Sequence, residues 1–279
     1  MLANYHTHSK YCDGKNTLRE MIDAAIEKGF DVLGFSGHGY TEFDFTYCMT
    51  ETDKYLAELA ALRDEYRGKI DILIGVEEDM RHFVDRSRYD YIIGSSHYFV
   101  MQGRDLAPSV NLIGGKYQHI DSNYQCMKEC VELFDGDTIS LAKSYYESFC
   151  DYILTRKPDI VGHFDLITKF DEMEDPIFLG DPEYTRLAEK YMEKVADVDC
   201  IFEVNTGAIS RGYRTLPYPA QNLLHILKKH GAKITLTSDC HAAENLDCFY
   251  TEAKKLLSDV GFEYLTMLTS DGVKKEYLK

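Results

Sequence analysis

Histidines and acidic residues recur in this chain at spacings that suit the binding of divalent metal ions. Near its start, the segment NYHTHSKYCDG places His6 and His8 two residues apart and Asp13 five residues further along. Because side chains of a strand alternate between its two faces, a two-residue spacing turns both imidazoles to the same side, where they could bind one ion. The segment TSDCH repeats this spacing with Asp239 and His241.

Other candidate ligands end short apolar runs that alternate with amphipathic helical stretches, the pattern of strands and helices around a parallel sheet. DVLGFSGH ends in His38, DILIGVEED contains Glu77, YIIGSSH ends in His97, and DIVGH ends in His163. Strands are predicted to begin near Leu2, Asp31, Asp71, Tyr91, Asp159, Cys200 and Lys233. One histidine near a strand end is usually only hydrogen-bonded. Here, however, six of the ten histidines fall at the carboxyl ends of predicted strands. A parallel barrel carries its active site at these ends, so the joint pattern indicates a metal-binding active site.

Imidazole and carboxylate donors together suit zinc, manganese or iron, and the absence of cysteine from these positions argues against a closed structural zinc site. The nine side chains exceed what one ion can use, so we expect a bridging carboxylate and a polynuclear centre. The candidate ligands are His6, His8, Asp13, His38, Glu77, His97, His163, Asp239 and His241.

Helix boundaries are marked by capping residues. Thr17 and Glu20 form a predicted capping box, and Asp181 with Pro182 marks a second helix start. A longer helix is expected over residues 138–156, and Gly231 ends another helix. Residues 99–126 show no clear period and are predicted to be a binding loop or lid. The last residues predict a hairpin that turns near residues 271–272.

The composition limits the classes of partner. The 279 residues contain no Pro-rich linker or internal repeat, so we expect a single domain over residues 1–279. A formal net charge of −16 disfavours nucleic acid and membrane surfaces. Scattered cysteines, the lack of an apolar run of about 20 residues and a start without signal-peptide character predict a cytoplasmic protein. The oligomeric state cannot be predicted.

In their order along the chain, the quoted segments resemble those of the PHP (polymerase and histidinol phosphatase) family. The segment EVNTGAISRGYR and the PYP that follows it resemble the histidinol-phosphate phosphatase branch. This resemblance extends from His6 to His241 and implies a distorted (β/α)7 TIM-like barrel with three divalent metal ions. It also implies a phosphoric monoester hydrolase of histidine biosynthesis, with L-histidinol phosphate as the expected substrate.

The resemblance also implies how the ligands are divided. One ion would be bound by His6, His8, Glu77 and Asp239, with Glu77 bridging to a second ion at His97 and His163. Asp13, His38 and His241 would bind the third ion. Glu78 is expected to point away from the ions because neighbouring side chains of a strand face opposite sides.

Hydrolysis of a phosphate monoester suits such a centre, because metal binding lowers the pKa of water from roughly 15.7 towards 7 and makes hydroxide available for attack on phosphorus. Arg211 and Arg214 are the predicted phosphate-binding side chains, with Arg211 also stabilising charge during the reaction. Asp239, His241 or a water could protonate the leaving alcohol, and the sequence does not decide between them. His119, in the predicted lid, is a further candidate for substrate binding.

Three functions follow as alternatives. A phosphatase acting on a small phosphorylated metabolite fits the acidic charge and the loop with Arg211. A metal-dependent nuclease, or another phosphoesterase of the same family, is the second, although a nuclease would require a basic groove. A non-catalytic metal-binding module is the third. Such a module is expected to have lost some of the metal ligands, and none is missing from this chain.

Overall fold

The computed structural model describes residues 1–100, 112–114 and 116–278 of the chain. Its centre is a parallel sheet of seven strands that are neighbours in chain order, each beginning within one residue of its predicted start. The strands are β1 (Ala3–Asn4), β2 (Val32–Phe35), β3 (Asp71–Asp79), β4 (Tyr91–Ser95), β7 (Ile160–Val161), β8 (Ile201–Asn205) and β9 (Lys233–Thr237).

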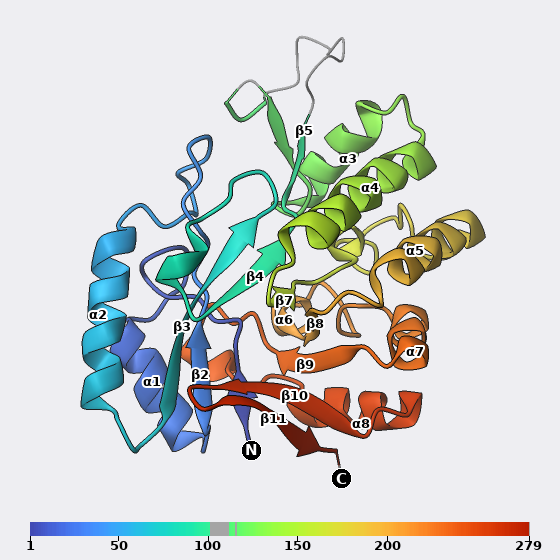
Figure 1. Cartoon of the computed structure of the whole chain (residues 1–279). Coiled ribbons are helices and arrows are strands. Elements are labelled where there is room, and N and C mark those ends of the chain that lie inside the picture. The colour runs from blue at the N-terminus through green and yellow to red at the C-terminus, as the bar shows by residue number, and fades with distance from the viewer. Residues whose placement is uncertain (101–111, 115, 279) are drawn as a thin grey trace.

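The sheet curls until its two edges meet. The backbone N–H of His8 donates to the carbonyl oxygen of Cys240 at 3.0 Å, and the N–H of Cys240 donates to that of His6 at 3.3 Å. These bonds join the segment after β1 to the segment after β9. The predicted distorted (β/α)7 TIM-like barrel is thereby confirmed (Figure 1). Because its seven strands are parallel, their carboxyl ends lie at the same rim.

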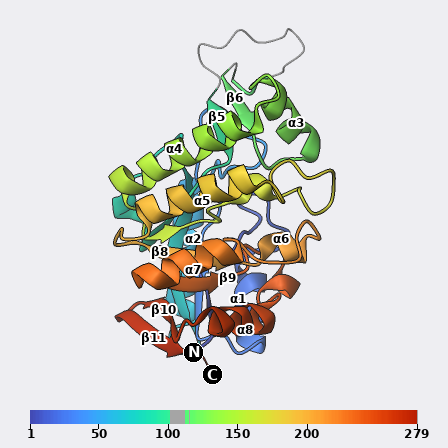
Figure 2. The same cartoon turned by 90° about the vertical axis from the view of Figure 1, so that its right-hand side faces the viewer.

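Helices surround the barrel. Figure 2 shows α4, α5, α7 and α8 stacked along one side, whereas α1 and α2 lie on the other side in Figure 1. Among the described residues, no helix has the length and apolar character needed to cross a membrane. The α-helices are α1 (Leu18–Glu27), α2 (Thr52–Glu65), α3 (Tyr124–Glu132), α4 (Thr138–Arg156), α5 (Pro182–Val195), α6 (Gly207–Ser210), α7 (Gln221–His230) and α8 (Tyr250–Val260). Single 3-10 turns span Arg86–Arg88, Leu166–Thr168 and Ala243–Asn245.

The predicted helix boundaries are confirmed where caps marked them. The hydroxyl of Thr17 accepts from the N–H of Glu20, and the Glu20 carboxylate accepts from the N–H of Thr17, so the capping box is complete. Asp181 caps α5, and Pro182 occupies its first turn. Gly231 ends α7 in the left-handed conformation that glycine adopts without strain.

Tyr91 fills the barrel interior beneath the carboxyl ends of the strands. It pairs with Gly75 in the register of β3 and β4, and a Cβ atom at Gly75 would lie 2.3 Å from its ring carbon Cζ. A Cβ atom at Gly34 of β2 would lie 2.3 Å from its hydroxyl. Two neighbouring strands, β2 and β3, therefore have glycine where the ring of Tyr91 lies against them. The hydroxyl of Tyr91 donates to the carbonyl oxygen of Tyr5.

Two antiparallel hairpins extend from the barrel. The predicted C-terminal hairpin is confirmed as β10 (Tyr264–Thr269) and β11 (Gly272–Tyr277). The prediction of an irregular segment over residues 99–126 was wrong where the structure describes it, because β5 (Tyr98–Val100) pairs with β6 (Tyr117–His119) and α3 follows. Strands of three residues are too short to show a period. The rest of the predicted lid, residues 101–111 and 115, lies outside the described residues.

Candidate metal centre

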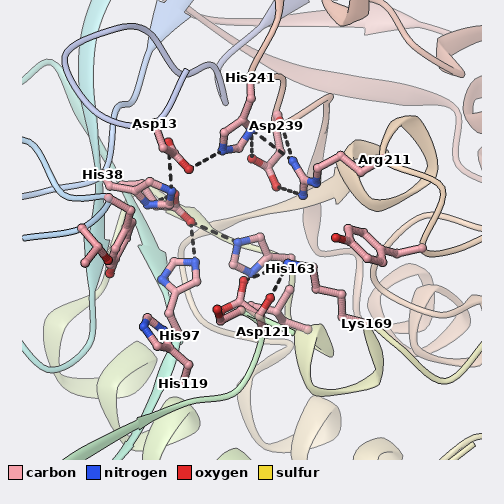
Figure 3. Close-up of a pocket in the computed structure, with 16 residues that line it drawn as sticks. Asp13, His38, His97, His119, Asp121, His163, Lys169, Arg211, Asp239 and His241 are labelled. Atoms are coloured by element: carbon pink, nitrogen blue, oxygen red, sulfur yellow. Dashed lines mark hydrogen bonds and ion pairs between the residues drawn. The ribbon is translucent and has the colours of Figure 1, made fainter. Parts of the chain in front are cut away.

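The nine predicted ligands converge at the carboxyl ends of the strands. Figure 3 shows those of them that line the cleft described below. They come from positions as far apart in the chain as His6 and His241. Their ligand atoms form four overlapping groups, within each of which all atoms lie within 4.8 Å of one another. The groups are His8–Asp13–His38–His241, His6–His8–Glu77, His6–His163–Asp239 and His38–Glu77–His97.

Glu77 occupies the middle of the cluster. Its Oε1 lies 3.0 Å from Nε2 of His163 and 3.3 Å from Nε2 of His97. Its Oε2 lies 2.9 Å from Nδ1 of His38 and 3.2 Å from Nε2 of His6. Burial alone would raise the pKa of Glu77, but His6, His38 and His97 outweigh burial and hold that pKa well below its usual range. The carboxylate is therefore ionised and could bridge two cations.

Two aspartates complete the cluster from the opposite side. Asp239 Oδ1 lies 3.1 Å from Nε2 of His8, and Asp13 Oδ2 lies 3.1 Å from Nε2 of His241. Asp239 has a positive φ of 44°, a strained conformation for a residue other than glycine. A Cβ atom at Gly207 would lie 2.8 Å from that of Asp239, so the missing side chain makes room for this approach.

Several buried atoms of the cluster have no hydrogen-bond partner among the residues that the structure describes. They include Nε2 of His6, Nε2 of His8 and Oε2 of Glu77, which belong to one of the four groups. Burial, reinforced by His241 and His38, lowers the pKa of His8 to about 3, so its imidazole is neutral and has a lone pair. Unpaired buried polar atoms are costly. Because these atoms face one another and are all metal-ligand types, the residues fit a divalent cation.

Two acidic residues that the sequence did not single out lie behind the histidines. Glu203 of β8 lies 2.9 Å from Nδ1 of His6 through its Oε2. Asp79 accepts from the backbone N–H of His97 at 2.8 Å and lies 3.4 Å from its Nδ1. The signal for Glu203 was a lone charged residue inside the apolar strand IFEVN, where side chains are expected to be buried.

The neighbouring carboxylate of Glu78 points to the other face of β3, as predicted. Arg156 of α4 donates to Oε1 at 2.8 Å and to Oε2 at 2.7 Å, and the hydroxyl of Tyr152 donates to Oε1 at 2.7 Å. The side chain of Glu78 is fully buried. It therefore anchors a helix to the sheet and takes no part in the cluster.

A cleft of about 290 Å³ leads to the cluster. Seven of the nine predicted ligands, all except His6 and His8, line it together with Arg211. Arg211 donates to Oδ2 of Asp239 at 3.0 Å and to its carbonyl oxygen at 2.9 Å, and lies 3.1 Å from Nδ1 of His241. The outer part of the cleft is lined by Thr46, Tyr47, His119, Asp121, Ser122, Leu166, Lys169 and Tyr213.

Comparison with known proteins places this arrangement in a family. Residues 4–207 match the model of the PHP domain. The chain belongs to the PHP domain family. A probable histidinol-phosphatase of Schizosaccharomyces pombe is 27% identical over 96% of this chain and 90% of its own length. The histidinol-phosphatase of Bacillus subtilis is 24% identical over 88% of this chain and 95% of its own.

Solved structures share the fold of this PHP chain. A putative histidinol phosphatase from Listeria monocytogenes superposes with a TM-score of 0.74 at 20% identity, covering 90% of this chain and 99% of that one. Histidinol phosphate phosphatase from Lactococcus lactis, complexed with Zn, L-histidinol and phosphate, superposes with a TM-score of 0.70 at 19% identity. That match covers 98% of this chain and 99% of the other.

Within the PHP fold, the predicted substrate residues have different surroundings. Arg211 and His119 line the cleft, and His119 Nε2 lies 2.9 Å from a carboxylate oxygen of Asp44. Arg214 is not among the described residues that line the cleft, and its role as a substrate ligand stays a prediction. Its guanidinium is buried over the ring of Tyr218, with its Cζ atom 4.4 Å from the ring centroid. Arg214 Nη1 also donates to the hydroxyl of Thr168.

Proposed function

We propose that this protein is a metal-dependent phosphatase that hydrolyses L-histidinol phosphate to L-histidinol and phosphate. The observation that carries the proposal is the convergence of histidine and carboxylate side chains, with buried unpaired ligand atoms, beside Arg211 at the base of a cleft. Relatives named histidinol-phosphatase, which match nearly the whole chain, support the same substrate. So does the Lactococcus lactis enzyme of the same fold, complexed with Zn, L-histidinol and phosphate.

We further propose that three divalent ions, zinc, manganese or iron, are bound by the nine predicted ligands. Once bound, such ions would neutralise phosphate charge and lower the pKa of a coordinated water towards 7. The group of His8, Asp13, His38 and His241 agrees with the proposed third site, to which it adds His8. His97 and His163 fall into different groups, so their common site stays a prediction that rests on the bridging position of Glu77.

Arg211 is the proposed ligand of the phosphate. A guanidinium has five N–H donors. Its two hydrogen bonds to Asp239 use two of them, which leaves other N–H groups for phosphate oxygens. Because Asp239 holds the guanidinium in place, its position at the cleft base is fixed before substrate binds, which favours stabilisation of charge that develops in the transition state. Asp239 and His241 remain the proposed groups for protonation of the leaving alcohol.

The outer cleft would accommodate the organic part of the substrate. L-Histidinol carries an ammonium group and an imidazole ring. Asp121 offers a carboxylate, and the rings of Tyr47, His119 and Tyr213 offer aromatic surface. We propose that Asp121 pairs with the ammonium group and that the aromatic side chains, including His119, contact the imidazole.

A phosphate-release assay tests this proposal. Metal-loaded protein should hydrolyse L-histidinol phosphate with a higher kcat/KM than other monoesters, a phosphodiester or single-stranded DNA. Removal of metal with a chelator should abolish activity, and added zinc or manganese should restore it. Preference for the diester or for DNA would contradict the proposal and support a nuclease. Metal binding without hydrolysis of any of these substrates would support a non-catalytic module. The cytoplasmic location stays a prediction.

A further inference from the structure

Glu203 is a buried charge that the proposed reaction does not use. It lies in the middle of β8, between β7 and β9, and only 1% of its surface is exposed. Buried carboxylates are rare unless their oxygens are paired. Its position behind the ligands, away from the described residues that line the cleft, excludes direct contact with substrate.

Both carboxylate oxygens of Glu203 are fully paired. Oε2 lies 2.9 Å from Nδ1 of His6 and accepts from the hydroxyl of Thr237 at 2.8 Å. Oε1 accepts from the backbone N–H of His163 at 2.7 Å and from the side-chain amide of Asn205 at 2.8 Å. One carboxylate thus joins two candidate ligands, His6 after β1 and His163 after β7.

The contact with His6 decides which ring nitrogen carries the proton. An ionised carboxylate only accepts hydrogen bonds, so Nδ1 of His6 must be the donor. The other nitrogen, Nε2, lies 3.2 Å from Oε2 of Glu77 and has no hydrogen-bond partner in the described part of the chain. Glu203 therefore favours the tautomer in which the lone pair of Nε2 points into the cluster.

We propose that Glu203 is a positioning residue of the metal centre, which fixes the tautomer and orientation of His6 and holds the backbone of His163 in place. The proposal rests on the metal centre proposed above. Acceptors behind metal-bound histidines commonly change metal affinity by 10- to 100-fold when they are removed. Here one acceptor serves two ligands from different strands.

The substitution Glu203→Gln tests the tautomer directly. The backbone N–H of His163 cannot become an acceptor, so the amide oxygen of glutamine is expected to face it. The amide nitrogen would then face His6 and donate to Nδ1, which places the ring proton on Nε2 and blocks the ligand atom. We expect metal affinity, measured by competition with a chelating dye, to fall about 10- to 100-fold.

Thr237→Val is the matched control. It removes one hydrogen bond to the same oxygen of Glu203 but leaves the carboxylate and its contact with His6. We expect this variant to keep nearly wild-type metal affinity, even if its melting temperature falls. Equal losses of affinity in both variants would show a merely structural role for Glu203 and overturn the proposal, as would unchanged affinity in Glu203→Gln.

A measurement on the wild-type protein covers the case in which Glu203→Gln does not fold. Nitrogen-15 NMR of the zinc-loaded protein should show a protected proton on Nδ1 of His6 and none on Nε2. A proton on Nε2 would overturn the proposal. Neither metal affinity nor this spectrum requires a substrate, so a failed phosphatase assay would leave both readouts intact and would count against the proposed reaction alone.

Discussion

The two ends of the barrel contrast sharply in their chemistry. At the carboxyl ends of the strands, buried histidines and carboxylates converge with unpaired ligand atoms. At the amino ends, the β10–β11 hairpin packs beneath the sheet, and the hydroxyl of Tyr5 donates to the carbonyl oxygen of Leu268 at 2.9 Å. The outer strand is largely exposed, with Val273 at 65%. The barrel strands thus carry reactive side chains at their carboxyl ends, whereas at their amino ends the barrel is covered by a hairpin.

This difference shows that of two residues close together in the sequence, one can belong to the candidate active site and the other can stabilise the fold. Glu77 belongs to the cluster and Glu78 to the packing of α4, while Arg211 lines the cleft and Arg214 is packed inside. Substitutions at such pairs should therefore separate activity from stability, and substitutions at the amino end should affect stability alone.

The largest effect is expected for Glu77→Gln. Loss of the shared carboxylate should lower kcat/KM for L-histidinol phosphate by about 10³-fold or more and reduce the bound metal. Glu78→Gln is the matched control, which should lower the free energy of unfolding by about 1.5–3 kcal/mol but keep the metal content. Steady-state kinetics, metal analysis and denaturant unfolding measure these quantities. Loss of metal in Glu78→Gln would contradict the proposal that only the face of β3 that carries Glu77 contributes to metal binding.

The paired arginines should give the next largest effect. Arg211→Ala removes the proposed phosphate ligand and should lower kcat/KM by about 10²- to 10³-fold. Arg214→Ala leaves the buried Asp165 without its nearby positive charge and should cost about 3 kcal/mol of stability, with much less effect on kcat/KM. Kinetics at a temperature where both variants are folded, together with thermal unfolding, compare them. A greater catalytic loss in Arg214→Ala would support Arg214 as a substrate ligand.

A smaller effect is expected at the amino end. Tyr5→Phe removes the hydrogen bond between the barrel and the hairpin, so the free energy of unfolding should fall by about 1 kcal/mol. Metal content and kcat/KM should remain at the wild-type level. Denaturant unfolding and the phosphate-release assay provide the test, and a clear change in kcat/KM would show that the two ends are coupled.

The smallest effect is expected for Val273→Thr on the exposed strand of the hairpin. The substitution keeps a β-branched side chain and removes no buried contact, so stability should change by no more than about 0.5 kcal/mol. This variant sets the baseline for the others in the same unfolding measurement. A much larger loss would indicate that this face is covered in solution.

The sequence predicted the strands and the cluster well because six of the seven barrel strands end where an apolar run meets a histidine or carboxylate. The helix caps were visible for the same local reason, since Thr17 and Glu20 act within one turn. The contact of Glu203 with His6 and that of Arg214 with Thr168 could not be predicted, because these partners lie 197 and 46 residues apart in the chain. The strand pair β5–β6 was missed because pairing between three-residue strands depends on tertiary contacts.

Gly75 has a consequence for the centre above it. Side chains of β3 alternate, so the face on which Gly75 makes room for Tyr91 is also the face that presents Glu77. A slip of one residue would press a branched side chain against the tyrosine ring and exchange the two adjacent glutamates. Gly75, which has no side chain, thus helps to fix the register of β3. This register determines that Glu77, and not Glu78, faces the cluster.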